Sequence, residues 1–132
     1  MTASLKFHST TRRARPEAQL QKCVIQHLML TGAPNMLYFS IPNEGRRSPR
    51  GAAELKRMGM RPGVADLCVI VDGRAFFMEF KAKGKKQTDV QKQFERDCAH
   101  VGVDCTMVDN ITDALHTLRH WNAIGKASWR KA

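Results

Sequence analysis

The chain has 132 residues, which suits one domain with a single hydrophobic core. Hydrophobic residues make up 42% of it, yet no apolar run is long enough to cross a membrane, which excludes a membrane-spanning protein. The formal net charge of +10 indicates a polyanionic partner, first nucleic acid and second an anionic membrane surface. Aromatic residues are only 7%, which disfavours recognition of single strands or RNA by base stacking.

Hydrophobic periodicity and turn residues predict four helices and four strands in the order α, β, α, β, β, α, β, α. Such an order predicts an α/β fold in which a mixed sheet is covered by helices on both faces. The third helix follows the loop 82–86, ends at Gly102 and has Val90, Phe94, Cys98 and Val101 on one side. The expected ranges are helix 16–31, strand 36–41, a helix from Pro49 to near Gly59, strands 65–71 and 74–81, strand 103–108 and helix 111–124.

A hairpin with a two-residue turn at Asp72-Gly73 brings two acidic residues together. With this turn, Asp66 lies directly opposite Glu79, and directly opposed side chains point to the same face with Cβ atoms ~5 Å apart. Lys81 is two residues beyond Glu79 and shares that face. The other face of the hairpin is apolar and is expected to enter the core; it carries Leu67, Val69, Val71, Phe76, Met78 and Phe80.

Two opposed carboxylates among apolar residues repel each other and need a compensating cation. Lys81 supplies one charge, and a hard divalent ion such as Mg²⁺ or Mn²⁺ would supply more. Taken alone, the triplet fits a salt-bridge cluster as well as it fits a metal site. Two more polar residues favour the site. Glu17 shares a helical face with core residues, although it could simply interact with a helix N-terminus. Gln91 follows on the next helix, although it could be a surface glutamine.

These residues resemble a known family. Asp66 followed by Glu79-Phe80-Lys81 resembles the signature of the PD-(D/E)xK restriction-endonuclease-like superfamily. Most of the chain, from Glu17 to about Trp121, is similar to its virus-type replication-repair nuclease (VRR-NUC) domains. The most similar segments are IPNEGRR (41–47), LKRMGMRPGVADL (55–67) and MEFKAKGKKQTDVQKQF (78–94). One difference is local, because Ala65 precedes Asp66 and the nearest proline is Pro62.

The resemblance implies a restriction-endonuclease-like core and metal-dependent hydrolysis of phosphodiester bonds. It implies that Asp66 and Glu79 bind the metal, assisted by Glu17 and the backbone carbonyl of Phe80. Lys81 would position or deprotonate the attacking water, and Gln91 would orient the site or the phosphate. It further implies DNA as the substrate, with branched DNA such as a Holliday junction favoured, a role in DNA repair and a homodimer to match the symmetry of a junction.

Basic blocks adjoin the proposed acidic site on both sides in the sequence. We expect them to contact the phosphate backbone through Arg46, Arg47, Lys83, Lys85 and Lys86, although such runs are often only solvated loops.

Residues 1–15 are expected to be a flexible basic arm, 16–125 the nuclease domain and 126–132 a basic tail. No cysteine pair has CxxC spacing, which favours reduced thiols and a cytoplasmic location, in a bacterium or a virus-infected host cell. The alternative function is a non-catalytic basic module that binds DNA during replication or repair.

Overall fold

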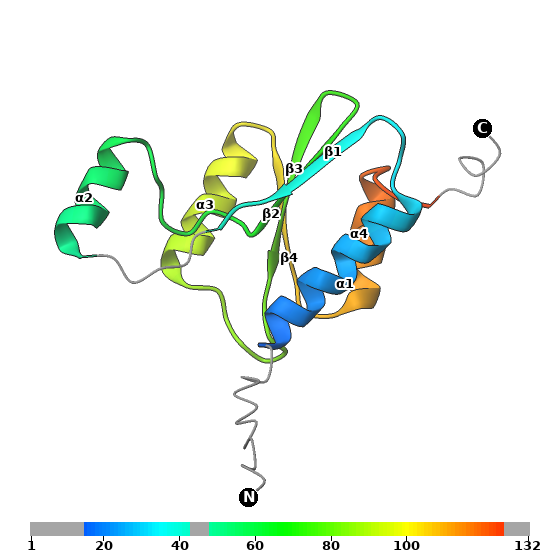
Figure 1. The fold of residues 1–132 in the computed structure, drawn as a ribbon, viewed down its shortest axis with the longest axis horizontal. Helices are drawn as coiled ribbons and strands as arrows, with labels where there is room; N and C mark the ends of the chain where they lie inside the picture. Colours follow the sequence, from blue (N-terminus) through cyan, green and yellow to red (C-terminus); the bar gives the residue numbers. More distant parts are fainter. Residues whose placement is uncertain (1–14, 43–47, 126–132) are drawn as a thin grey trace, which may run out of the picture.

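The computed structural model describes residues 15–42 and 48–125. The predicted basic arm and tail, together with Arg46 and Arg47, lie outside these ranges, except for Arg15. Figure 1 shows the helices and strands in the predicted order. They are α1 (Pro16–Thr31), β1 (Met36–Ser40), α2 (Pro49–Arg57), β2 (Leu67–Val71), β3 (Arg74–Phe80), α3 (Asp89–His100), β4 (Asp104–Val108) and α4 (Ile111–His120).

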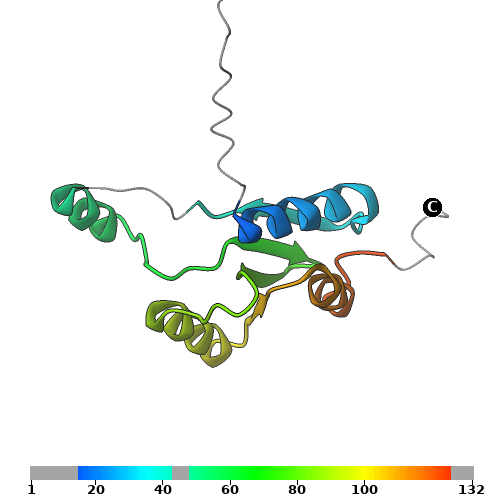
Figure 2. The same cartoon turned by 90° about the horizontal axis from the view of Figure 1, so that it is seen from below.

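The four strands form one mixed sheet in the order β1-β2-β3-β4. β1, β2 and β3 are antiparallel neighbours, and β4 runs parallel to β3. Helices α1 and α4 pack on one face of the sheet and α3 on the other, as Figure 2 shows. The prediction of a mixed α/β sheet with helices on both faces is therefore confirmed. In the described part of the chain, no helix is both long and apolar enough to span a membrane.

The predicted hairpin and its register are confirmed. Val71 pairs with Arg74 and Leu67 with Met78, as a two-residue turn requires. The turn residues Asp72 and Gly73 have φ angles of 51° and 76°. A turn in which both central residues are left-handed matches the natural twist of a hairpin, and Asp-Gly adopts it readily.

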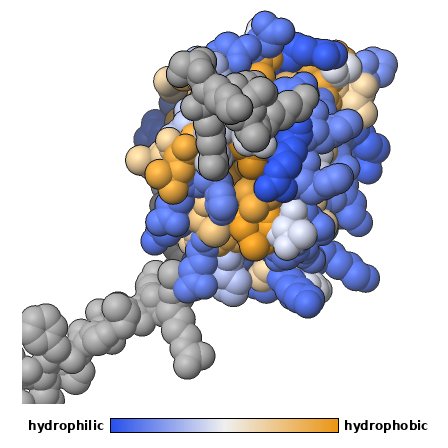
Figure 3. All heavy atoms as spheres, turned by 90° about the vertical axis from the view of Figure 1, so that its right-hand side faces the viewer, coloured by the Kyte–Doolittle hydropathy of each residue, from blue (hydrophilic) through white to orange (hydrophobic). Residues whose placement is uncertain are grey.

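The main core lies between the sheet and the helices α1 and α4. The predicted apolar face of the hairpin enters it, with Leu67, Val69 and Met78 fully buried. Seen from the right-hand side of Figure 1, the molecule shows hydrophilic residues around a central hydrophobic strip (Figure 3), and Met29 and Leu30 of α1 are exposed. On the other face, Phe94 and Cys98 of α3 pack in a smaller cluster with Ala65.

Two details of the predicted helices are wrong. Val90 and Val101 were expected on the buried side of α3, but they are 46% and 71% exposed. Val90 is the second residue of α3, and Val101 follows its last residue, His100, as the C-cap. The last helix ends at His120 rather than at 124, because Asn122 adopts a left-handed conformation with φ of 59°.

Helix α2 stands apart from the rest of the described structure (Figures 1 and 2). It has no buried residue and makes no contacts with any other helix or strand of the described chain. Its own polar groups stabilise it locally. The Ser48 side chain accepts a hydrogen bond from the backbone N–H of Gly51 at 3.1 Å, and Arg57 pairs with Glu54 at 2.6 Å.

Candidate functional site

A cavity of about 420 Å³ opens at the end of the hairpin opposite the Asp72-Gly73 turn. All six residues assigned to the metal and catalytic site in the sequence line it. Glu17 comes from the first turn of α1, Glu79 and Phe80 from the end of β3, and Gln91 from the start of α3. Asp66 immediately precedes β2 and Lys81 immediately follows β3. The fold therefore brings together residues that are far apart in the sequence.

Asp66 is fixed beside Glu79 by the backbone of the hairpin. Its side-chain Oδ2 accepts a hydrogen bond from the backbone N–H of Phe80 at 2.9 Å. Its carbonyl oxygen accepts another from the backbone N–H of Ile41 at 2.8 Å. The Asp66 carboxylate thus extends the β2–β3 pairing by one position and lies against the residue next to Glu79. The predicted juxtaposition of the two acids is confirmed.

Glu79 is the single buried charged or polar residue in the described chain, at 5% exposure. Burial, and next the neighbouring Asp66 carboxylate, raise the pKa of Glu79 to about 8, while the positive charge of Lys81 opposes the rise. Ionising both carboxylates would need positive charge beyond that of Lys81, so a bound cation would favour the ionised form of Glu79. The site is therefore chemically suited to attract a further cation.

Gln91 contacts the acidic pair directly. Its Nε2 donates a hydrogen bond to Glu79 Oε1 at 2.9 Å. Glu17 enters from the opposite wall of the cavity, and its Oε2 is buried without a hydrogen-bond partner. A buried oxygen of this kind is an available acceptor for a donor or a cation.

Lys81 is held by the parallel pair of strands. Its backbone N–H donates to the carbonyl of Val108 at 2.9 Å, which continues the β3–β4 pairing beyond Phe80. The side chain of Lys81 is half-buried and lines the cavity with Glu79. Its predicted position on the same face as Glu79 is confirmed.

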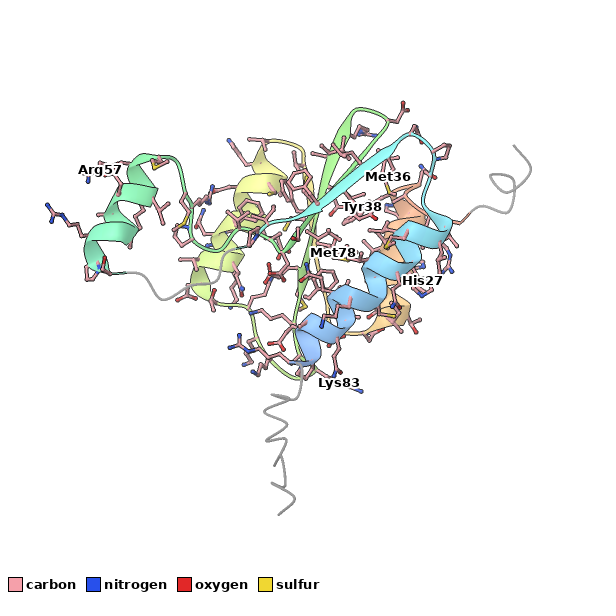
Figure 4. All side chains as sticks on the ribbon, in the orientation of Figure 1. His27, Met36, Tyr38, Arg57, Met78 and Lys83 are labelled. Atoms are coloured by element: carbon pink, nitrogen blue, oxygen red, sulfur yellow. The ribbon has the colours of Figure 1, made fainter. Side chains whose placement is uncertain are left out.

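The predicted DNA-contacting lysines follow the site in the chain. Lys83, Lys85 and Lys86 are all exposed in the loop between β3 and α3. Figure 4 places Lys83 at the end of the molecule where α1 begins, which is the end that contains Glu17. The three lysines follow Lys81, which lines the cavity, but do not line it themselves, and their contacts with a substrate stay a prediction.

Several cavity residues were missed in the sequence. Ser40 ends β1 and lines the cavity with the next two residues, Ile41 and Pro42. Ala18 and Gln21 line it from α1, and Arg15 lines it from just before α1. The antiparallel pairing of β1 with β2 carries Ile41 to Asp66, and this pairing had no local signal. Only the i,i+4 spacing of Gln21 from Glu17 on one helix could have indicated part of this set.

A segment before Asp66 packs tightly on the start of α3. A Cβ atom added to Gly63 would lie 2.4 Å from the carbonyl oxygen of Val90 and 2.8 Å from the backbone nitrogen of Gln91. Arg61 forms an ion pair with Asp97, and its guanidinium lies 5.4 Å from the centre of the Phe94 ring. These contacts fix the segment that leads to Asp66 against the helix that carries Gln91.

We expect Gly63→Ala to destabilise the protein by about 3 kcal/mol and to disturb the contact between Gln91 and Glu79. The reason is the sum of a left-handed backbone, with φ of +79°, and a clash with backbone atoms that cannot rotate away. Gly59→Ala is the matched control, since Gly59 has φ of +97° and no atom within 4 Å of the added Cβ. Urea denaturation of both variants measures the difference in the free energy of unfolding. Equal losses of stability would show that the Gly63 contact does not stabilise the protein.

The metal-binding capacity of the cavity depends on a mixed set of ligands. Within residues 15–42 and 48–125, no three His, Cys, Asp or Glu side chains are gathered so that they could hold a metal ion by themselves. Asp66 and Glu79 are the adjacent pair, and the buried oxygen of Glu17 is the orphaned acceptor. Oxygen donors of this type fit a hard divalent cation, and the set must be completed by backbone carbonyl oxygens or water.

Two solved structures are similar to this chain. One, described as "VRR_NUC domain protein", has a TM-score of 0.61 and 19% sequence identity, over 80% of this chain and 87% of its own. The other, described as "VRR_NUC domain", has a TM-score of 0.57 and 19% identity, over 80% of this chain and 97% of its own. No family profile and no curated protein sequence matches the chain. The chain therefore has the fold of a VRR-NUC domain, a restriction-endonuclease-like α/β fold.

Proposed function

We propose that this protein is a nuclease that hydrolyses phosphodiester bonds in DNA with Mg²⁺ or Mn²⁺. The observation that carries the proposal is the meeting of Asp66, Glu79, Lys81 and Gln91 in one open cavity, with Glu79 buried and its pKa raised by burial and by Asp66. The VRR-NUC fold supports the same reaction class, since the domain is named for nuclease activity. The proposal rests on these residues rather than on the fold alone.

The residues of the cavity fit a divalent cation. Asp66 and Glu79 would hold it with the Phe80 carbonyl oxygen, and Glu17 would contribute its orphaned oxygen directly or through water. When bound, such an ion neutralises the phosphodiester and lowers the pKa of a coordinated water.

The chain's own groups organise the remainder of the reaction. Lys81 would orient the attacking water and hold its negative charge as it forms. Gln91 would keep the Glu79 carboxylate in place through the hydrogen bond that it already donates. Asp66 is steadied in the same way by the backbone N–H of Phe80.

DNA is the substrate class that best suits the surface. Lys83, Lys85 and Lys86 are exposed in the loop that follows the cavity residue Lys81 and would neutralise phosphates of a bound strand. Most large aromatic side chains of the described chain pack inside the protein, as with the Phe76 and Trp121 rings, which stack with centroids 5.0 Å apart, and Phe39 is 47% exposed. Recognition through the sugar-phosphate backbone is therefore favoured, and it suits an enzyme that selects the shape of DNA. We propose branched DNA as the preferred form, cut by a homodimer.

A cleavage assay on a panel of DNAs tests the proposal. Four-way junctions, flaps, splayed arms and linear duplexes of equal length are incubated with the protein in Mg²⁺, in Mn²⁺ and in EDTA. We expect cleavage that requires the metal and is fastest on branched substrates. Binding of DNA without cleavage under every metal condition would instead support the alternative of a non-catalytic DNA-binding module. Equal cleavage of branched and linear DNA would reject the structural preference alone.

The contribution of the basic residues is tested by salt dependence. We expect Arg46→Ala/Arg47→Ala and Lys85→Ala/Lys86→Ala each to weaken DNA binding and to reduce the slope of log affinity against log salt, by about one unit for each phosphate that is no longer neutralised. The measurement is a salt titration in Ca²⁺, which is expected to prevent cleavage. Arg74→Ala/Arg119→Ala is the matched control, because it removes the same charge from the hairpin tip and α4. A wild-type slope in both test variants would place the DNA elsewhere.

A further inference from the structure

Gln91 uses both ends of its side-chain amide in the first turn of α3. Its Oε1 accepts a hydrogen bond from the backbone N–H of Thr88 at 2.9 Å, and its Nε2 donates to Glu79 Oε1 at 2.9 Å. In return, the backbone N–H of Gln91 donates to Thr88 Oγ1 at 3.3 Å. The Thr88–Gln91 pair is a complete capping box. Gln91 therefore belongs to the helix cap and to the cavity at the same time.

The cap decides which end of the Gln91 amide faces the cavity. The backbone N–H of Thr88 is only a donor, so it requires the oxygen end of the amide. The nitrogen end must then point at Glu79, whose carboxylate oxygen accepts. A half-turn of the amide would place a donor against the Thr88 donor and an acceptor against the Glu79 acceptor, which loses both hydrogen bonds.

Few other contacts constrain this turn of the helix. Thr88 and Asp89 are exposed, and Val90 is 46% exposed. The first buried side chain of α3 is Phe94, almost one turn beyond Gln91. Gly63 packs on the backbone of Val90 and Gln91, but it does not reach the amide group. The orientation of the Gln91 side chain thus depends on the reciprocal bonds with Thr88.

We propose that Thr88 is a positioning residue, which holds Gln91 so that its amide nitrogen is presented to Glu79. Thr88 itself does not line the cavity and acts only through Gln91. The consequence of this role for cleavage rests on the proposed nuclease function, whereas the orientation of the amide does not. A helix cap here also serves to order the carboxylate at the centre of the site.

Three variants separate these roles. Thr88→Val keeps the shape of the side chain and the backbone N–H that binds Gln91 Oε1, but it removes the acceptor for the backbone N–H of Gln91, which closes the turn that brings these groups together. Thr88→Ser keeps the acceptor. Gln91→Glu keeps the capping box, in which glutamate is as suitable as glutamine, but it replaces the donor that faces Glu79 with a second acceptor.

The first measurement is the NMR signal of the Gln91 side-chain amide in metal-free protein, assigned by its absence in Gln91→Glu. We expect a signal displaced from those of exposed glutamines and protected from solvent exchange in the wild type and in Thr88→Ser. In Thr88→Val we expect it to shift towards the position of exposed glutamines, because the reciprocal bond that keeps the backbone N–H of residue 88 within reach of Oε1 is lost. An unchanged signal in Thr88→Val would overturn the proposal.

The second measurement is the single-turnover cleavage rate, with DNA affinity in Ca²⁺ measured in parallel. We expect Thr88→Val to lower the rate about 10-fold without weakening DNA binding, as loss of a group that supports a metal ligand typically does. Thr88→Ser should restore the wild-type rate, and Gln91→Glu should cleave no faster than Thr88→Val.

Asn110→Ala provides the matched control. Asn110 caps α4 by accepting a hydrogen bond from the backbone N–H of Asp113 at 2.8 Å, and it does not line the cavity. Asn110→Ala should lower the melting temperature about as much as Thr88→Val does but leave the cleavage rate unchanged. Equal rate losses in the two variants would reduce Thr88 to an ordinary helix cap. If the wild type cleaves no DNA, the proposed function fails, and the amide signal still decides whether Thr88 positions Gln91.

Discussion

Asp66→Asn and Glu79→Gln are each expected to abolish DNA cleavage, with a fall in rate of at least ~10³-fold, equivalent to about 4 kcal/mol of transition-state stabilisation. Each change removes one negative charge from the pair that would hold the metal. The hydrogen bonds of the site survive, because the introduced asparagine still offers an oxygen to the Phe80 N–H and the introduced glutamine still offers one to Gln91. The fold should therefore be retained while the reaction is lost.

The measurement is single-turnover cleavage of a four-way junction, with circular dichroism to verify folding and DNA binding in Ca²⁺ to verify substrate affinity. Asp72→Asn is the matched control. It makes the same chemical change at the opposite end of the same hairpin, and its left-handed φ of 51° is a conformation that asparagine tolerates well. Wild-type cleavage by either site variant would refute the assignment of the acidic pair.

The second large effect concerns the relative stability of the wild type and Glu79→Gln, which we expect to depend on pH and on divalent metal. The folded-state pKa of Glu79 is raised to about 8, so the folded protein prefers Glu79 protonated. Ionisation of Glu79 therefore destabilises the folded state. This destabilisation is absent below about pH 4.5, the ordinary pKa of a glutamate, and it grows as the pH rises towards 8. Glu79→Gln resembles the protonated form at every pH. In EDTA we expect it to be more stable than the wild type at pH 8.5, by about 2 kcal/mol, and nearly equal to it at pH 4.5.

Divalent metal should reverse this order. Mg²⁺ or Mn²⁺ stabilises whichever native state binds it, so it should raise the melting temperature of the wild type more than that of Glu79→Gln or Asp66→Asn. Thermal denaturation from pH 4.5 to 8.5, with EDTA and with each metal, gives both results. Stability curves for the wild type and Glu79→Gln that stay parallel across this range would mean that Glu79 is not strained by its surroundings.

The location of the site could be predicted from the sequence because one local feature determines it. Asp72-Gly73 specifies a two-residue turn, and a period of two residues per strand then sets which side chains oppose each other. The position of Asp66 beside Glu79 follows without any knowledge of the remaining fold. Glu17 and Gln91 were predicted from their places on the first and third expected helices together with the family resemblance, and the structure brings both to the same cavity.

Contacts between distant segments could not be predicted in this way. The packing of Gly63 on the backbone of Val90, and the pairing that carries Ile41 to Asp66, depend on how whole elements meet. The exposure of Val90 has the same origin, since helical periodicity predicts a stripe but not how far the sheet extends beneath it. The roles of the site residues and the identity of the metal are chemical properties, which cleavage and metal titration would establish.

The isolation of α2 has a consequence for how the protein unfolds. A helix of nine residues is marginal by itself in water, and this one buries no side chain against the domain. Its backbone amide hydrogens should exchange with deuterium through local opening, at rates close to those of an unstructured peptide. The amides of β2 and β3, at the centre of the sheet, should exchange only when the whole domain opens. The cooperative folding unit of this chain therefore excludes α2, and a melting curve reports on the sheet and its three packed helices without registering it.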